Sequence, residues 1–278
     1  MSNEVYLASA RRTPIGAFQG VLAPATAPQL GAPAIAAAIK DSGLTPEQMD
    51  ESIMGCVLMA GIGQAPGRQA ALAAGVPQKV PATTVNKMCG SGLKAVMLAS
   101  DQIRAGNAEV IVAGGIESMT NAPYLLPKAR AGLRMGHAEL IDHMFYDGLQ
   151  SPFDGQMMGF FADATAKKYG FTRQQQDDYA AESVRRAMSA IEAGHFTGEI
   201  APVTIKDRKG ERVVARDETP FTCDIAKIPS LKPAFNKDGT VTAASSSSIS
   251  DGAAATVIVS AAAAVSYTHL TLPTILRV

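Results

Sequence analysis

The feature that most constrains the fold is a regular alternation of short apolar runs with segments of helical periodicity. Apolar runs at 5–8, 53–59, 82–85 and 108–113 are separated by alanine-rich or amphipathic segments. Short runs that are apolar throughout, rather than alternating, are typical of strands buried on both faces of a parallel sheet. We therefore expect an α/β protein with a layered, mostly parallel sheet covered by helices.

Composition and charge exclude several classes of protein. The 278 residues are 47% hydrophobic, which is enough for one large domain or two modest ones, and 25 basic residues balance 25 acidic ones. This balance gives no electrostatic reason to expect binding to nucleic acid or to an anionic membrane. Three cysteines are an odd count that argues against a disulfide framework and for a reducing compartment. With neither a signal peptide nor an apolar run that spans a bilayer, we expect a soluble, cytoplasmic protein with no membrane partner.

Cys89 lies in the turn between a predicted strand, 82–85, and a predicted helix, 93–103. Glycines and a serine surround it in the sequence. Free backbone N–H groups and the helix dipole favour negative charge at such a turn, so thiolates there are more reactive. The alternative interpretation is a small buried cysteine. We prefer that alternative for Cys56, inside an apolar run, but not for Cys89.

Two other segments suggest phosphate binding. The glycines of 61–69 lack the spacing G-x-G-x-x-G, Pro66 interrupts them, and no acidic residue follows suitably, so we predict a turn that starts a helix. The pair Arg11 and Arg12 could hold a phosphate, but we favour an ion pair that anchors a loop.

The chain changes character over 119–244, which is more polar, richer in proline and charge, and holds most of the aromatic residues. We predict an inserted loop subdomain, with a helix over 160–168 and another that Thr172 caps. The adjacent Met157 and Met158 could form a soft wall for a flexible ligand or fill a core.

Residues 240–250 are dense in hydroxyl groups, and this composition alone would indicate a linker. The apolar run that follows, 253–259, indicates instead a return into the first sheet. The predicted core therefore comprises residues 1–118 and 245–265. His137, His143 and His195 lack the spacing of metal ligands, and we predict no metal site.

The segment 86–94 resembles the nucleophile motif of thiolases of the acetyl-CoA acetyltransferase type. Further blocks that resemble this family, in family order, are 12–18, 63–71, 114–119, 231–235 and 251–255. The resemblance covers about residues 4–262. It implies the N-terminal half of a thiolase fold, whose two similar α/β halves stack as five layers, and homo-oligomers (dimers or tetramers) when full length.

The resemblance also implies the roles of single residues. Cys89 matches the acyl-accepting nucleophile, Phe235 and Ser247 match positions near the pantetheine arm, and Met158 matches a pocket-loop residue. The subdomain 119–244 would thus bind coenzyme A. No cofactor would be bound permanently, because acetyl-CoA and CoA are the substrates. The implied activity forms or cleaves acetoacetyl-CoA or another 3-ketoacyl-CoA through an acyl-cysteine.

The chain departs from the family pattern in several places. Met157 stands where many biosynthetic members carry a histidine, and Ser245 stands where an asparagine is usual. The second-half motifs Gly-His-Pro and Cys-x-Gly-x-Gly are absent, and the only late histidine, His269, lies in unrelated surroundings. Residues 266–278 do not resemble the family. We therefore expect a truncated thiolase with a correct nucleophile, an apolar helix face left exposed and negligible turnover.

Three other functions are compatible with parts of this pattern. A ketoacyl synthase also uses a cysteine at a strand-to-helix turn, but the separated thiolase blocks argue against it. A non-catalytic CoA-binding or lipid-binding relative would not need Cys89. A cysteine hydrolase of acyl thioesters would need a histidine and an aspartate nearby.

Overall fold

The computed structural model describes residues 4–208, 210–267 and 276–277. Its strands are β1 (Val5–Arg12), β2 (Gly16–Ala17), β3 (Glu51–Gly55), β4 (Ala82–Val85), β5 (Val110–Ser118), β6 (Tyr124–Leu125), β7 (Ile141–Asp142), β8 (Val203–Asp207), β9 (Gly210–Val214), β10 (Ser250–Ser260) and β11 (Leu276–Arg277). Its helices are α1 (Ala27–Asp41), α2 (Pro66–Ala73), α3 (Ser91–Arg104), α4 (Met158–Tyr169), α5 (Arg173–Glu192), α6 (Thr219–Thr222) and α7 (Ala261–Tyr267).

One mixed sheet organises the molecule, with strand order β11-β1-β10-β5-β3-β4, and β2 also pairs with β10. Strands β3, β4 and β5 run parallel to one another, whereas β10 lies antiparallel between β1 and β5. Strand β10 is the predicted return of 253–259 into the first sheet. The predicted α/β fold class is confirmed, but the sheet is mixed and not mostly parallel, because β10 pairs antiparallel with both of its neighbours.

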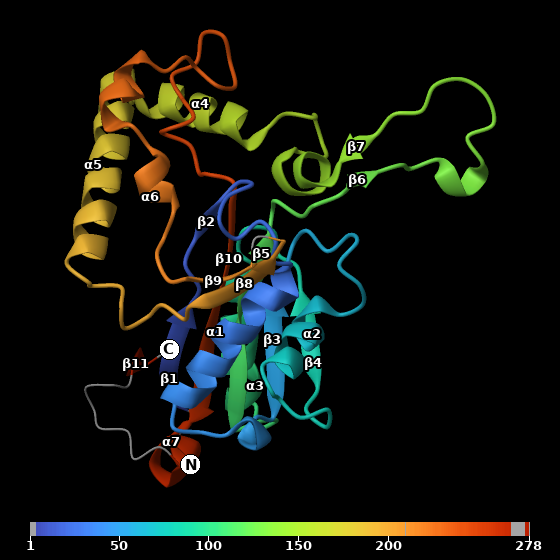
Figure 1. The fold of residues 1–278 in the computed structure, drawn as a ribbon, viewed down its shortest axis with the longest axis vertical. Coiled ribbons are helices and arrows are strands. Elements are labelled where there is room, and N and C mark those ends of the chain that lie inside the picture. Colours follow the sequence, from blue (N-terminus) through green and yellow to red (C-terminus); the bar gives the residue numbers. More distant parts are fainter. Residues whose placement is uncertain (1–3, 209, 268–275, 278) are drawn as a thin grey trace.

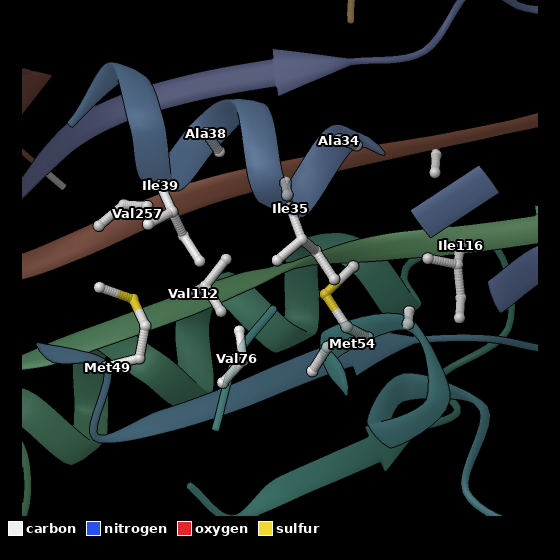
Figure 2. Close-up of a cluster of buried hydrophobic side chains, with 14 of the residues drawn as sticks. Ala34, Ile35, Ala38, Ile39, Met49, Met54, Val76, Val112, Ile116 and Val257 are labelled. Atoms are coloured by element: carbon white, nitrogen blue, oxygen red, sulfur yellow. The ribbon is translucent and has the colours of Figure 1, made fainter. Parts of the chain in front are cut away.

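Helices cover both faces of this sheet (Figure 1). Helices α1 and α2 pack on one face, where alanines on α1 let its backbone approach the strands closely. Figure 2 shows Ile35 and Ile39 pointing from α1 toward Met54 and Val112 on the strands, and all four side chains are buried. Helix α3 packs on the other face through a smaller cluster that contains Ala95, Ala99 and Ile103. These two apolar layers hold the sheet between them.

Helix α3 also has an exposed apolar side. Leu93 is 68% exposed and Met97, one helical turn later, is 49% exposed. An exposed apolar helix face was predicted above, and Leu93 and Met97 form one on the helix that follows Cys89. Among the described residues, no helix is both long enough and apolar enough to cross a membrane.

Between β5 and β10 the chain leaves the sheet. Figure 1 shows α4, α5 and α6 beyond one end of the sheet, with the β6–β7 pair extending to the side. The predicted capping box of α5 is present, because Thr172 and Gln175 satisfy each other's backbone N–H groups. Strand β8 turns back and contributes Val203 and Ile205 to the main core. The division at 118/119 and 244/245 stays a prediction.

Arg12, the last residue of β1, links that strand to the segment between β5 and β10. Its guanidinium binds both carboxylate oxygens of Asp217 at 2.7 and 2.9 Å and one oxygen of Glu199 at 2.6 Å. The ring of Phe196 lies 5.2 Å from it. Burial acts to raise the pKa of Asp217, but Arg12 and the Ile15 N–H lower it below its ordinary value. The interpretation of Arg12 as a loop anchor, rather than a phosphate ligand, agrees with these contacts.

Two predicted strand boundaries are wrong. The predicted strand 53–59 ends at Gly55, because the backbone that follows turns away to bind a side chain of β5. The predicted strand 108–113 continues through two glycines to Ser118, because β10 pairs with it along that whole length. Of the predicted non-family tail, 266–278, residues 268–275 and 278 lie outside the described residues.

Replacing Arg12 by Ala is expected to lower the free energy of unfolding by about 2 kcal/mol, because it leaves the buried Asp217 carboxylate without its cation. Urea denaturation followed by circular dichroism measures this difference. The matched control is Arg11→Ala, which removes a surface ion pair with Asp41 and should cost less than about 1 kcal/mol.

The same pair should respond to acid. Because the folded state lowers the pKa of Asp217, its stabilisation is present above the unfolded pKa and is lost as the pH falls through the folded value. The stability difference between wild type and Arg12→Ala should therefore shrink below about pH 4. A constant difference across that range would contradict this account.

Candidate active site

Cys89 lies in the short turn between β4 and α3, as the sequence predicts, and its side chain is exposed. Gly90 occupies the cap position and Ser91 is the first helical residue. The first N–H groups of a helix have no acceptor inside it, and they carry the positive end of the helix dipole. The sulfur therefore stands beside the positive end of the α3 dipole.

Side chains of the turn itself fix its shape. Met88 adopts a left-handed backbone conformation, with φ of 49°, which is strained for a residue with a Cβ atom. Its N–H donates to the Asn86 side-chain oxygen at 2.9 Å. The Ser91 hydroxyl accepts from the Lys87 N–H at 2.8 Å and donates to the Met88 carbonyl at 2.6 Å. These bonds hold Cys89 in one place relative to α3.

The start of α3 lies directly on the sheet. A Cβ atom on Gly55 of β3 would stand 2.4 Å from the Ser91 carbonyl carbon, so only glycine fits there. Gly92 of the helix similarly faces Gly115 of β5, where an added Cβ would lie 3.5 Å from that backbone. Because the backbone at the start of α3 contacts the backbone of β3 and β5 directly, the sheet fixes the position of the turn that carries Cys89.

Two cavities adjoin Cys89. The inner one has a volume of about 300 Å³ and lies over the ends of the central strands. It is lined by Gly55, Val57, Leu58, Met88, Cys89, Ser91, Gly92, Gly115, Ile116, Glu117, Met119, Gly148, Leu149 and Gly252. The outer one, about 700 Å³, lies between the Cys89 turn and the start of α4. It is lined by Met88, Cys89, Tyr146, Asp147, Gly148, Gln150, Ser151, Pro152, Phe153, Gly155, Met158 and Phe161.

Glu117 is an ionisable side chain in the wall of the inner cavity. One carboxylate oxygen accepts the Val57 N–H at 2.9 Å, and the other accepts the Leu58 N–H at 3.0 Å. The Cys56 sulfur lies 3.7 Å from the same carboxylate. Burial raises the pKa of Glu117, while the two N–H groups oppose that shift.

Cys56 differs sharply from Cys89. Its side chain is fully buried, and burial together with the charge of Glu117 raises its pKa to about 12. A thiol with such a pKa is a poor nucleophile near neutral pH. The structure agrees with the interpretation of Cys56 as a small core residue.

Of the three residues predicted to bind CoA, only Met158 lines a cavity beside Cys89 within the described parts of the chain. Met158 shares the outer cavity with Cys89. The Phe235 ring packs on Gly159, at the start of α4, so closely that a Cβ there would lie 2.2 Å from ring atoms. Ser247 is exposed and, within the described parts of the chain, is absent from the lining of both cavities.

Sequence reasoning missed Glu117, Gly148 and Leu149 as cavity residues, and it left His143 without a role. His143 accepts the Ala60 N–H at 3.4 Å and binds the Asp147 carboxylate at 2.6 Å. No local pattern marks these residues, because each acts on a segment far away in the chain. Among the described residues, no group of three or more His, Cys, Asp or Glu side chains could hold a metal ion.

Comparison with known proteins gives consistent results. Residues 5–262 match the family described as thiolase, N-terminal domain. The acetyl-CoA acetyltransferases of Pseudomonas aeruginosa and Cupriavidus necator are each 51% identical to this chain over 87% of its length. The chain spans 62% of the length of each of these relatives. The crystal structure of the Bacillus anthracis acetyl-CoA acetyltransferase superposes with a TM-score of 0.93 at 39% identity, over 97% of this chain and 69% of that one.

Brief treatment of the native protein with iodoacetamide at pH 8 should label Cys89 and leave Cys56 unlabelled. With a pKa of about 12, the thiolate fraction of Cys56 at pH 8 is on the order of one in ten thousand, and its side chain is buried. Peptide mapping by mass spectrometry measures both sites. Equal labelling of the two cysteines without denaturant would show that the 56–58 segment is not packed as described.

Proposed function

The chain belongs to the thiolase family, and on this premise we propose that Cys89 takes up an acyl group from a CoA thioester, as part of an acetyl-CoA acetyltransferase. The observation that carries the proposal is the exposed sulfur at the start of α3, open to two adjoining cavities. Two relatives with 51% identity are named acetyl-CoA acetyltransferases, which supports the same activity.

The first step is an exchange of thioesters. The Cys89 thiolate attacks the acyl carbonyl carbon, the bond from that carbon to the CoA sulfur breaks, and CoA leaves as a thiolate that takes up a proton. The old and new bonds are both thioesters, so little energy is lost, and the acyl-enzyme stays reactive. A serine would form a less reactive oxygen ester, which explains the choice of cysteine.

The surroundings of Cys89 suit the charges of this step. The attacking sulfur is negative, and the helix N-terminus beside it favours that form. The carbonyl oxygen becomes an oxyanion as the sulfur adds, and placed hydrogen-bond donors must meet it. The N–H groups of Gly90 and Ser91 already donate to the carbonyls of Lys87 and Met88, so we assign this role to the next N–H groups of the first turn of α3, those of Gly92 and Leu93.

The two cavities differ in the ligand parts that they suit. The inner one is small and lined largely by glycines and apolar side chains, which fits a short acyl group. The outer one is larger and reaches Met158, which fits the longer pantetheine arm of CoA. In this arrangement the Phe235 ring packs on Gly159 and so supports the start of α4, where Met158 lies. Ser247 would bind the pantetheine arm outside the two cavities.

The second step makes or breaks a carbon–carbon bond. In one direction a second acetyl-CoA loses an α-proton and attacks the acyl-cysteine, which yields acetoacetyl-CoA. In the other, Cys89 cleaves a 3-ketoacyl-CoA. Both directions need a group that moves protons beside the sulfur. The family resemblance implies a histidine and a second cysteine for this task. Among the described residues no histidine lines either cavity, so we propose that both come from outside this chain.

Two further properties belong to the same proposal. The full-length protein would act as a homo-oligomer, a dimer or tetramer, as the family resemblance implies. A reducing cytoplasm suits an exposed thiol that must stay free.

Incubation with acetyl-CoA should add one acetyl group to Cys89, because the exposed thiolate can attack the thioester without help from other residues. Mass spectrometry of the peptide that contains Cys89 measures the adduct. Cys89→Ala should lose it, whereas Cys223→Ala, which removes the half-buried third cysteine, should keep it. Acetylation that persists in Cys89→Ala would refute the assignment of the nucleophile.

This chain alone should not turn over acetoacetyl-CoA and CoA above the rate of its Cys89→Ala variant. Glu117 is the only carboxylate in the lining of the inner cavity within the described residues, and its oxygens already accept two backbone N–H groups. The loss of acetoacetyl-CoA absorbance measures the rate. Turnover that depends on Cys89 would show that the proton-transfer groups lie within this chain.

A further inference from the structure

Glu117 holds a segment of backbone in the place where β3 would otherwise continue. Strand β3 ends at Gly55, and the N–H groups of Val57 and Leu58 turn toward the Glu117 carboxylate on β5. A carboxylate that accepts two backbone N–H groups forms charge-assisted bonds, which are stronger than neutral ones. The position of the 56–58 loop therefore depends on this side chain.

The same loop touches the turn that carries Cys89. The Val57 carbonyl accepts the Asn86 side-chain N–H at 3.5 Å, a long bond. The oxygen of that Asn86 amide accepts the Met88 N–H at 2.9 Å, and Met88 is the strained residue just before Cys89. A continuous path of hydrogen bonds thus leads from Glu117 through Val57 and Asn86 to the neighbour of Cys89.

The loop also forms part of the cavity wall. Val57 and Leu58 line the inner cavity, and the Leu58 side chain faces Gly148 on the opposite wall, where an added Cβ would stand 3.2 Å away. Farther along the same loop, the Ala60 N–H donates to His143. Glu117 and His143 therefore hold the loop at two points.

We propose that Glu117 is a positioning residue for Cys89: its carboxylate fixes the 56–58 loop, and the loop, through Asn86, fixes the turn that presents the sulfur. The inference rests on the proposed function, in which Cys89 accepts the acyl group. Glu117 acts here through its two acceptor oxygens and not by moving a proton.

Two substitutions separate this role from an effect of charge. Glu117→Gln keeps the size of the side chain but offers only one acceptor oxygen. Glu117→Asp keeps the charge but is one methylene too short to reach both N–H groups. Both should slow the alkylation of Cys89 by iodoacetamide at least about threefold, because a loosened turn holds the sulfur less firmly at the helix N-terminus.

The direction of the change decides between the explanations. If Glu117 acted on Cys89 only by its negative charge, Glu117→Gln would speed alkylation and Glu117→Asp would leave it unchanged. Either of these results, or an unchanged rate in both variants, would overturn the proposal. Site-specific mass spectrometry follows Cys89 alone, and circular dichroism verifies the fold of each variant.

A matched control lies at the other end of the sheet. Asp50 also accepts two backbone N–H groups, those of Glu109 at 2.7 Å and Val110 at 2.9 Å, both through a single carboxylate oxygen. Asp50→Asn should lower thermal stability without slowing the alkylation of Cys89. If Asp50→Asn slowed the alkylation of Cys89 as much as the Glu117 variants do, the slowing would reflect a general loss of stability, and the proposal would be overturned.

Asn86 provides a second test on an exposed turn, independent of whether the Glu117 variants fold. Asn86→Ala cuts the path between the loop and Met88, so it should slow the alkylation of Cys89 by itself. Glu117→Gln added to Asn86→Ala should then have little further effect. Alkylation at the wild-type rate in Asn86→Ala, or fully additive effects in the double variant, would contradict the path.

The acyl-transfer proposal is tested separately by the acetylation of wild-type Cys89. If acetyl-CoA leaves wild-type Cys89 unmodified, the proposed function fails, while the alkylation series still reports on the path from Glu117. If wild type is acetylated and the Glu117 variants are acetylated equally fast, the function stands and the positioning role fails.

Discussion

The contact on which the site depends is backbone against backbone, where the first turn of α3 lies on β3 and β5. Gly55, Gly92 and Gly115 leave no side chain between the helix and the sheet. A close contact of this kind allows little displacement, because a Cβ on Gly55 would overlap the backbone of Ser91, and one on Gly115 would press on Gly92. The contact with the sheet therefore positions the start of α3, and the bonds from the 56–58 loop through Asn86 add to it at the turn that carries Cys89.

Much of the fold could be predicted from local patterns. The strand, turn and helix around Cys89, the alanine-rich helix α1 and the cap at Thr172 all follow from spacing and from residue preferences. The ends of β3 and β5 could not be predicted in this way. Glycine usually indicates the end of a strand. Only the pairing with strand β10 shows that β5 continues through Gly114 and Gly115.

In the candidate site, too, local features could be predicted from the sequence and long-range contacts could not. Cys89 stands out because every feature that makes its sulfur reactive lies within a few residues. Glu117 does not, because its partners Val57 and Leu58 precede it by 60 and 59 residues and the contact exists only in the folded sheet. Phe235 and Ser247 were predicted from the family resemblance alone, and the contact of the Phe235 ring with Gly159 of α4 joins segments too far apart in the sequence to be predicted from local patterns.

Strand β10 has a consequence for how the protein is made. It lies between β1 and β5, yet it is synthesised after both, so the middle of the sheet stays empty until residue 260 leaves the ribosome. Until then the facing edges of β1 and β5 carry unpaired backbone groups and can bind other extended chains. Late, long-range pairing of this kind slows the folding of a nascent chain and leaves its unpaired edges open to association for longer.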